Sequence, residues 1–548
     1  MSDSPASFRS RIDRLSAPTA AKTVLRDIGA LQVLIGLLML IPFVVSLLYG
    51  EWYSAVSFLI GSGVTALVGG VTYKLCEDAP EPKRHHAMIV AALGWLVTAA
   101  FGAVPFIVAA YITPEGVLNS FIPAGADYAR SSLLNFRDPL HAFFESVSGY
   151  TTTGLTMSVH EPSIGHGFLW YRSQMQWIGG AGMIVLSLAI LRQPHGTAGI
   201  SLYRSEGRDE KLRPSIAGTA KAIWKIYLGV TALLAVYLAA ATFLVQPGYG
   251  IENTIFDALN HAMTGQSTGG FSTLDNSIAG YGSYAMELVH IPAMITGAIA
   301  IPVYYGAISE RDIREFTRDP QVRLLFGMFV VGVIGLTAFL ARWVGVPYHG
   351  DPIGYVGRVA TSKAFRDGLF QFISAQSTTG WQTSAIGDWV PGGVMFIVFG
   401  AMLLGGSAGA TVGGIKILRG YILARGIGWE VSRSFLPEHA IEDLRIGDRI
   451  FTAEEANDEI RAAATLAVAY LVVLGLSLFV LLAVLPSEFT LADAIFEVAT
   501  AQGTVGLSSG ITGPGMPAVA EILFIVQMWM GRLEIIPILV LISSLFRR

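Results

Sequence analysis

The sequence has little charge and almost no cysteine. Only 14% of its 548 residues are charged, whereas about a quarter is usual in soluble domains, and 53% are hydrophobic. This balance excludes an ordinary soluble protein and indicates a membrane protein. The single cysteine, Cys76, excludes an internal disulfide. The net charge of −4, without any basic run, gives no indication of a nucleic-acid partner.

Recognisable catalytic motifs are also missing. The sequence contains no HExxH, no GxSxG and no paired aspartate motif, so an intramembrane enzyme is the least favoured class of function. The glycine clusters "GGAGM" (179–183) and "GSAG" (406–409) lie inside apolar runs with no preceding strand, which argues against nucleotide binding. We therefore expect neither an enzyme nor an organic cofactor.

Long apolar runs are present instead. The first begins near residue 30 and is about 20 residues long, which is a membrane-spanning length rather than a signal-peptide core. Ten such runs predict an all-α polytopic membrane protein with ten transmembrane helices. They lie at about 30–49, 55–75, 88–111, 168–191, 218–245, 284–308, 322–345, 393–425, 461–485 and 518–546.

Four shorter apolar runs alternate with the last eight spans, at about 141–153, 257–269, 367–379 and 493–505. Runs of about 13 residues cannot cross a hydrocarbon layer of about 30 Å, so they should enter the membrane and return. The prediction is four membrane-pore-membrane repeats around a pseudo-fourfold central pore. The expected segments are a cytoplasmic N-terminus and two-helix prefix (1–80) and repeats at 81–192, 193–310, 311–425 and 426–548, the third with a broken second helix.

Each short run ends in a polar Thr-x-Gly loop: "GYTTTGLTM" (149–157), "GQSTGGFST" (265–273), "AQSTTGWQT" (375–383) and "AQGTVGLSS" (501–509). One such loop would be an ordinary turn. Four copies whose glycines are spaced 116, 110 and 126 residues apart are not. Non-helical backbone at membrane depth survives only when buried or lining water, and rings of carbonyls can replace the hydration shell of a cation. The pattern therefore favours a cation pore.

Acidic residues stand 13 before the loop glycine in three repeats, and histidine takes that place in the first. We expect the aspartates to cap the short helices rather than to contact ions. The residues are Asp257, Asp367, Asp493 and His141, with Asp138 nearby. Glu161, Asp275 and Asp388 follow the loops, and two readings stay open: they concentrate cations at the mouth, or they are ordinary solvated charges.

Basic residues are distributed unequally between the two sides. With the N-terminus placed in the cytoplasm, 28 Lys and Arg fall on the cytoplasmic side and 7 outside, while Arg532 lies within a span. The predicted orientation has both termini in the cytoplasm and all four loops opening outward.

The loops, their order and two further segments are similar to the Trk/Ktr/HKT superfamily of potassium transporters, and the two-helix prefix resembles its TrkH/TrkG branch. The resemblance implies a potassium filter, because glycine at the filter position of every repeat goes with potassium selectivity in that family. The implied potassium-binding residues are Thr152, Thr153, Gly154, Thr268, Gly269, Gly270, Thr378, Thr379, Gly380, Thr504, Val505 and Gly506. Gly269 departs from its counterparts and suggests a looser second loop.

The first of the further segments is "MLLGGSAGATVGGIKILRG" (402–420). Its host run, 393–425, would reach about 50 Å as one helix, so it should break at its glycines. In the family this stretch is an intramembrane gate below the filter; the alternative is a small-residue packing face. The implied gate residues are Gly405, Gly406, Ser407, Gly409, Thr411, Gly413, Gly414 and Arg532. Lys416 and Arg419 are expected at the cytoplasmic boundary.

Arg532 stands mid-span in the second segment, "MWMGRLEIIPILVLI" (528–542). A buried arginine there costs about 2.5–3.5 kcal/mol, so it should face a water-filled path or a carboxylate. The resemblance places it beside the gate. The alternatives are a pair with Glu534, which the two-residue spacing disfavours, and a snorkelling side chain.

The resemblance further implies potassium uptake across the inner membrane by a lipid-embedded homodimer, controlled by a separate cytosolic nucleotide-binding subunit of TrkA type. The rival is symport of potassium with protons or sodium. It would need an ionisable group in the path, and Arg532, the one good intramembrane candidate, does not release its proton.

Overall fold

The computed structural model describes residues 17–191, 216–343, 352–389, 393–437, 443–446 and 449–546. Part of the predicted excess of basic residues on the cytoplasmic side lies outside these ranges. It belongs to the N-terminal residues 1–16, most of the basic loop 192–217, and Arg547 with Arg548.

Helices dominate the described chain, as predicted. The prefix consists of α2 (Ala17–Leu38) with α3 (Leu40–Leu48), and α4 (Trp52–Leu75). The first helix of each repeat is α5 (Arg84–Ile112), α10 (Ile216–Val245), α15 (Pro320–Trp343) and α20 (Ala453–Val484). The short helices are α7 (Pro139–Tyr150), α11 (Ile251–Gln266), α17 (Lys363–Gln376) and α21 (Leu491–Gly503). The second helices are α8 (His166–Leu191), α12 (Tyr284–Ala298) with α13 (Ile301–Glu310), α18 (Gly393–Leu403) with α19 (Ile417–Arg433), and α22 (Ala518–Arg532) with α23 (Ile536–Phe546).

Membrane-spanning length is clear for most of the expected spans. Within the described ranges, six helices are long and apolar enough to cross a membrane, or eight when the bent pairs α12–α13 and α22–α23 each count as one. The two other expected spans are α8 and the broken α18–α19 pair. Taken together these elements match the predicted ten-span architecture of a multi-pass membrane protein.

Two of the second helices are bent rather than straight. α12 and α13 meet at 90°, just before Pro302, and α22 and α23 meet at 111°. Glu534 and Ile535 form the second corner with φ of 59° and 65°, a left-handed conformation that is rare for a β-branched residue. The expected spans over 284–308 and 518–546 are therefore bent helix pairs. Local composition does not show the first bend, because that corner is made by tertiary contacts of the backbone, described below.

The glycine-rich loop, defined here as residues 404–416, separates α18 from α19. Two-residue strands at its ends, β1 (Leu404–Gly405) and β2 (Ile415–Lys416), pair in parallel and bring its two ends together. The run 393–425 does break where its glycines cluster. Glycine supplies the positive φ of 86° at residue 409 and 68° at residue 414.

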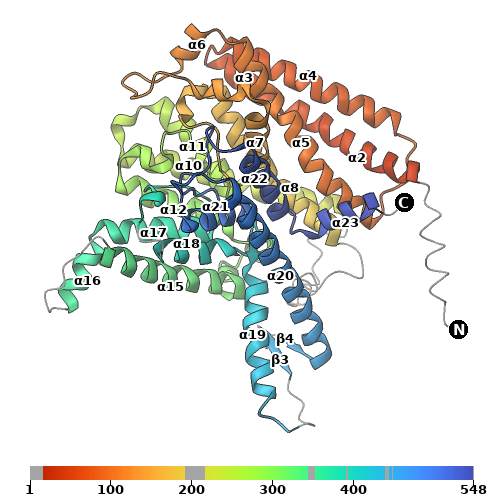
Figure 1. The fold of residues 1–548 in the computed structure, drawn as a ribbon, viewed down its shortest axis with the longest axis vertical. Helices are drawn as coiled ribbons and strands as arrows, with labels where there is room; N and C mark the ends of the chain where they lie inside the picture. The colour runs from red at the N-terminus through yellow and green to blue at the C-terminus, as the bar shows by residue number, and fades with distance from the viewer. Residues whose placement is uncertain are drawn as a thin grey trace.

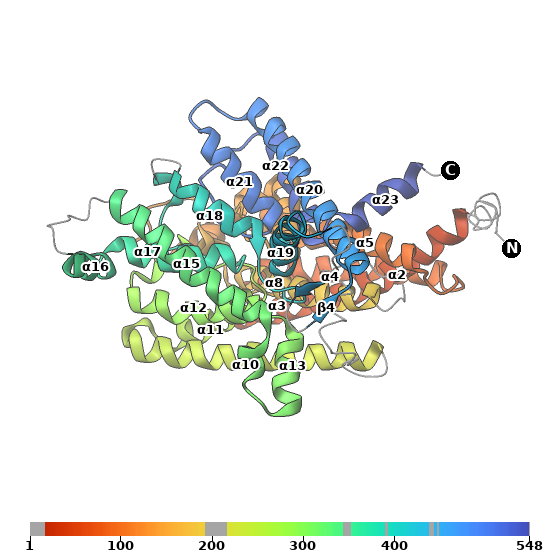
Figure 2. The ribbon, with the colours of Figure 1, turned by 90° about the horizontal axis from the view of Figure 1, so that it is seen from below.

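The repeats follow one another around a common centre. Seen from below, α20–α22 lie opposite α10–α13, and α15 with α17 lies opposite α5 (Figure 2). The prefix helices α2 and α4 pack against α5, outside this ring of repeats (Figure 1). The last helix, α23, also packs on α5, burying Leu533, Ile538 and Leu541 against Ala91 and Ala92.

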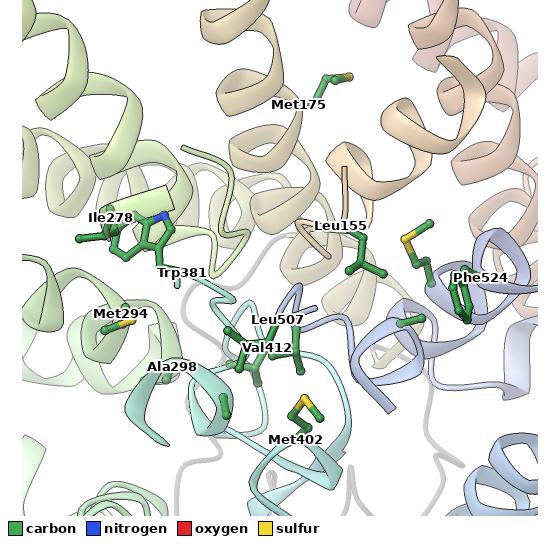
Figure 3. Packing of buried hydrophobic residues seen from close by; sticks show 14 of the residues in the cluster. Leu155, Met175, Ile278, Met294, Ala298, Trp381, Met402, Val412, Leu507 and Phe524 are labelled. Atoms are coloured by element: carbon green, nitrogen blue, oxygen red, sulfur yellow. The ribbon is translucent and has the colours of Figure 1, made fainter. Parts of the chain in front are cut away.

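An extension projects from the bundle, formed by α19, the start of α20 and the antiparallel strands β3 (Leu444–Ile446) and β4 (Arg449–Phe451) (Figure 1). It has a small apolar core of its own that includes Leu418, Ile422, Trp429 and Phe451. The main core surrounds the four loops, and Figure 3 shows Leu155, Trp381 and Leu507 within it. The large apolar residue after each loop glycine is at most 2% exposed; these residues are Leu155, Phe271, Trp381 and Leu507.

Candidate functional site

The four Thr-x-Gly loops have one backbone conformation. Their first threonines have φ of 54°, 50°, 52° and 49°, in the left-handed region where threonine is uncommon. In the first loop the Thr152 amide donates to the Gly149 carbonyl (3.0 Å) and the Thr153 amide to the Ser148 carbonyl (2.9 Å), which is a Schellman helix end. The same pair of hydrogen bonds recurs in the other three loops. The same uncommon turn in all four loops indicates that they are copies of one structural repeat.

The loop glycines join the four turns into a closed ring. Their φ values are 92°, 83°, 82° and 97° for Gly154, Gly270, Gly380 and Gly506. A Cβ added to each would overlap the carbonyl oxygen of the preceding position in the next loop, and the last loop meets the first. The pairs are Gly154 with Gly269, Gly270 with Thr379, Gly380 with Val505, and Gly506 with Thr153. We call this arrangement the four-loop ring, and it contains all twelve residues expected at the filter.

Gly269 is explained by a neighbour on α8. A Cβ at Gly269 would overlap the Gln176 side chain, whose Nε2 donates to the Gly269 carbonyl and whose Oε1 accepts from the Phe271 amide at 3.0 Å. The second loop is thus held at two points by an amide. The sequence of the loop alone could not show this, because Gln176 lies 93 residues away.

A buried polar residue nine positions before each loop glycine binds the residues that follow that glycine. Glu145 accepts from the Met157 amide (2.8 Å) and the Thr156 hydroxyl (3.0 Å). His261 Nε2 lies 3.0 Å from the Ser272 hydroxyl. We call these the brace residues: Glu145, His261, Gln371 and Glu497, all 0% exposed.

Sequence reasoning missed the brace residues. Aligning the repeats on their glycines would have brought them together, because this position is polar in all four copies.

One buried arginine links the first two loops. Arg172 on α8 is 1% exposed and pairs with Glu145 at 2.7 Å. Its guanidinium also donates to the Ser272 carbonyl (3.3 Å) and lies 4.0 Å from the centre of the Phe271 ring. The positive charge of Arg172 therefore compensates the Glu145 carboxylate, and its guanidinium connects the first loop to the second.

The glycine-rich loop lies directly beneath the four-loop ring. The Thr411 hydroxyl is 3.1 Å from the Thr268 hydroxyl, and the Gly413 amide donates to the Thr378 hydroxyl at 3.3 Å. A Cβ on Gly413 would overlap the Thr504 hydroxyl. In this structure the loop thus occupies the space under three of the four first threonines.

The α12–α13 pair holds the glycine-rich loop through backbone groups that its corner leaves free. At the α12–α13 corner, the Ala298 carbonyl accepts from the Ser407 amide (3.1 Å) and the Ile301 amide donates to the Gly409 carbonyl (3.3 Å). The Thr411 hydroxyl donates to the Gly297 carbonyl at 3.1 Å. An unbroken helix would use these groups internally, so the bend supplies the binding site for the loop.

Arg532 ends α22 at the second corner, 2% exposed. Its guanidinium donates to the Thr411 carbonyl in the loop and to the Gly179 carbonyl of α8, the latter at 2.9 Å. Glu534 pairs with Arg419 of α19 at 2.6 Å, so the alternative of an Arg532–Glu534 pair is wrong. Lys416, expected at the boundary, is 8% exposed and donates to the Val412 carbonyl.

The expected capping role holds in only part of the aspartate set. Asp493 is the third residue of α21 and forms a capping box with Thr490, and Asp138 caps α7 through the Leu140 amide. Asp257 and Asp367 lie inside their helices, because α11 and α17 begin one turn or more earlier than the apolar pattern suggested. The cap prediction is wrong for these two.

The acidic residues beyond the ring differ in exposure. Asp388 is exposed, while Glu161 is 9% exposed and lies 4.0 Å from Arg172. Burial raises the pKa of Glu161 to about 8, partly offset by Arg172. Asp275 accepts from the Tyr128 hydroxyl at 3.2 Å and lies 3.8 Å from His160.

Comparison with known proteins agrees with this geometry. The model of the TrkH family, described as a cation transport protein, matches residues 115–547. The Trk system potassium uptake protein TrkH of Halomonas elongata is 31% identical over 96% of this chain and 99% of its own length. The Escherichia coli K12 protein of the same name is 29% identical over 96% and 99%. The crystal structure of the potassium transporter TrkH from Vibrio parahaemolyticus superposes with a TM-score of 0.76 at 27% identity, covering 96% and 99% of the two chains.

Proposed function

Because the chain belongs to the TrkH family of cation transport proteins, we propose that it takes up potassium across the cell membrane through the four-loop ring. The carbonyl oxygens and threonine hydroxyls of the ring would replace the water around a dehydrated potassium ion. The names of the similar proteins, which are potassium uptake proteins and a potassium transporter, support this choice of ion.

The observation that carries the proposal is closure of the ring, in which each glycine abuts a carbonyl of the next loop. A ring without gaps fixes the spacing of its oxygens. The hydroxyl oxygens of Thr152 and Thr504 are buried and have no hydrogen-bond partner among the described residues. Buried oxygens without donors are costly unless something compensates them, and a bound cation would do so.

The glycine-rich loop acts as the gate in this proposal. Its contacts with Thr268 and Thr378 support a closed position in this structure, and Arg532 holds it there while placing a positive charge beside the path. Opening would require the loop to leave these contacts. Ions would then pass from the ring to the cytoplasm.

The proposal includes a homodimer in the inner membrane with both termini in the cytoplasm. It also includes a separate nucleotide-binding subunit of TrkA type that controls the gate, an inference supported by the word "system" in the names of the similar proteins. The extension of α19 and α20 suits such a partner, since it leads directly from the gate and exposes Phe435 (85%) and Ile427 (68%).

Rubidium uptake into liposomes tests the proposal. The purified chain would be placed in vesicles loaded with potassium, and uptake would be measured against external potassium, sodium and lithium, without a pH gradient. Uptake blocked by potassium but not by sodium is expected. Equal block by sodium would refute potassium selectivity, and uptake that needs a proton or sodium gradient would favour the symport alternative.

A further inference from the structure

The four brace residues differ in charge although they occupy one structural position. Glu145 and Glu497 are carboxylates, His261 is an imidazole and Gln371 is an amide, each nine residues before its loop glycine. The Gln371 oxygen, in the orientation that satisfies its neighbours, accepts from the Thr383 amide (2.8 Å) and the Ser384 amide (3.0 Å). An uncharged amide is therefore sufficient to hold the residues that follow the loop glycine.

The two carboxylates have different surroundings. Glu145 is neutralised by Arg172 at 2.7 Å. Glu497 accepts from the Ser508 hydroxyl (2.8 Å), from the amide and hydroxyl of Ser509 (2.8 and 2.9 Å), and from the amide and hydroxyl of Thr512, the amide at 3.0 Å. Within the described ranges no lysine, arginine or histidine pairs with it.

All the donors to Glu497 are uncharged, and together they approach both carboxylate oxygens. These donors match a carboxylate, which accepts at both of its oxygens. Among the described residues no basic side chain pairs with the carboxylate that holds the fourth loop, whereas the carboxylate that holds the first loop is paired with Arg172. Inside a protein such a charge acts over a longer distance than in water, because little solvent separates it from the ring.

We propose that Glu497 sets the affinity of the ring for cations, as a charge and not only as a brace. This inference rests on the proposed function, because it assumes that the ring is where the cation binds. The negative charge attracts a dehydrated cation to the outer half of the ring from one side. Glu145, whose charge is neutralised by Arg172, holds the first loop in position without adding net charge.

Glu497→Gln tests the role, because the chain already uses glutamine at the equivalent place in the third repeat. The measurement is the concentration dependence of rubidium uptake in liposomes, which separates KM from the maximal rate. We expect KM to rise about tenfold for Glu497→Gln, the scale of a unit charge acting at an effective dielectric of about 20 over a few residue lengths. Sodium should still fail to compete.

Gln371→Glu is the reciprocal variant. Its carboxylate would still accept from the Thr383 and Ser384 amides, and the added charge should lower KM. The double variant Glu497→Gln/Gln371→Glu moves the charge to the adjacent loop and should return KM toward that of the unchanged chain. A purely structural brace predicts no such rescue.

Three results would overturn the inference: unchanged KM in Glu497→Gln, no rescue in the double variant, or loss of sodium exclusion without a change in KM. If Glu497→Gln does not fold, as judged by its elution profile in detergent, the Gln371→Glu variant alone decides the matter. Failure of the proposed function is a separate outcome, since the unchanged chain would then show no potassium-selective uptake at all.

Discussion

Replacing Arg532 with methionine should open the path of the isolated chain. The guanidinium donates to the Thr411 carbonyl of the gate and to the Gly179 carbonyl of α8, while its Nε lacks a partner within the described residues. A hydrogen bond from a charged donor contributes about 1.5–3 kcal/mol. Only the bond to Thr411 reaches the gate, so its loss costs the closed position about 1.5–3 kcal/mol. Since about 1.4 kcal/mol corresponds to a factor of ten, the open fraction should rise about ten- to a hundredfold.

The assay is the initial rate of rubidium uptake by the chain alone, with Arg532→Lys as the matched control. Lysine keeps the positive charge but cannot span both carbonyls with a planar fork. If the hydrogen bonds hold the gate, both variants conduct faster than the unchanged chain. If repulsion by the charge dominates, only Arg532→Met does. An Arg532→Met protein that elutes normally and takes up rubidium no faster would refute the reasoning.

Three further variants probe the ring and its outer side. Gly380→Ala forces a Cβ against the Val505 carbonyl at a φ of 82°, so sodium should now compete with rubidium uptake; unaltered competition would contradict the ring geometry. Gln176→Met keeps the volume but removes both hydrogen bonds to the second loop, which should weaken potassium selectivity more than it lowers the melting temperature, a comparison made by uptake and by thermal unfolding in detergent. Glu161→Gln should flatten the pH dependence of stability. Its folded pKa of about 8 lies above the ordinary value of 4.5, so the unchanged chain loses stability as pH rises from about 5 to 8; parallel melting profiles of the two proteins would count against this.

Local patterns in the sequence were sufficient to predict features that recur along the chain or that show an unusual local composition. Four repeated Thr-x-Gly loops predicted the residues that the structure brings into one ring, and the glycines of the run 393–425 predicted its break. Run length and charge predicted the ten spans. These signals are local, because membrane thickness and glycine conformation act on short stretches of chain.

Features that depend on distant partners could not be predicted in this way. The α12–α13 corner exists because the freed Ala298 carbonyl and Ile301 amide find partners in the glycine-rich loop, more than 100 residues further along the chain. Glu534 appeared to be a candidate partner of Arg532, yet it pairs with Arg419 across 115 residues. The brace position can be found by aligning the repeats, but the role of these residues could not, because a buried glutamate is rare and its donors come from residues that follow the loop glycine.

Closure of the ring has a consequence for biogenesis. Three of its contacts join repeats that are consecutive in the sequence. The fourth joins Gly506 of the last repeat to Thr153 of the first. During synthesis the first three loops can meet in order, while the carbonyl of Thr153 and the glycine of the third loop wait for the last repeat to insert. A nascent chain with three repeats therefore has an incomplete, water-accessible wall on one side. Assembly of the ion path is thus a late event, completed only when the final short helix has been delivered to the membrane.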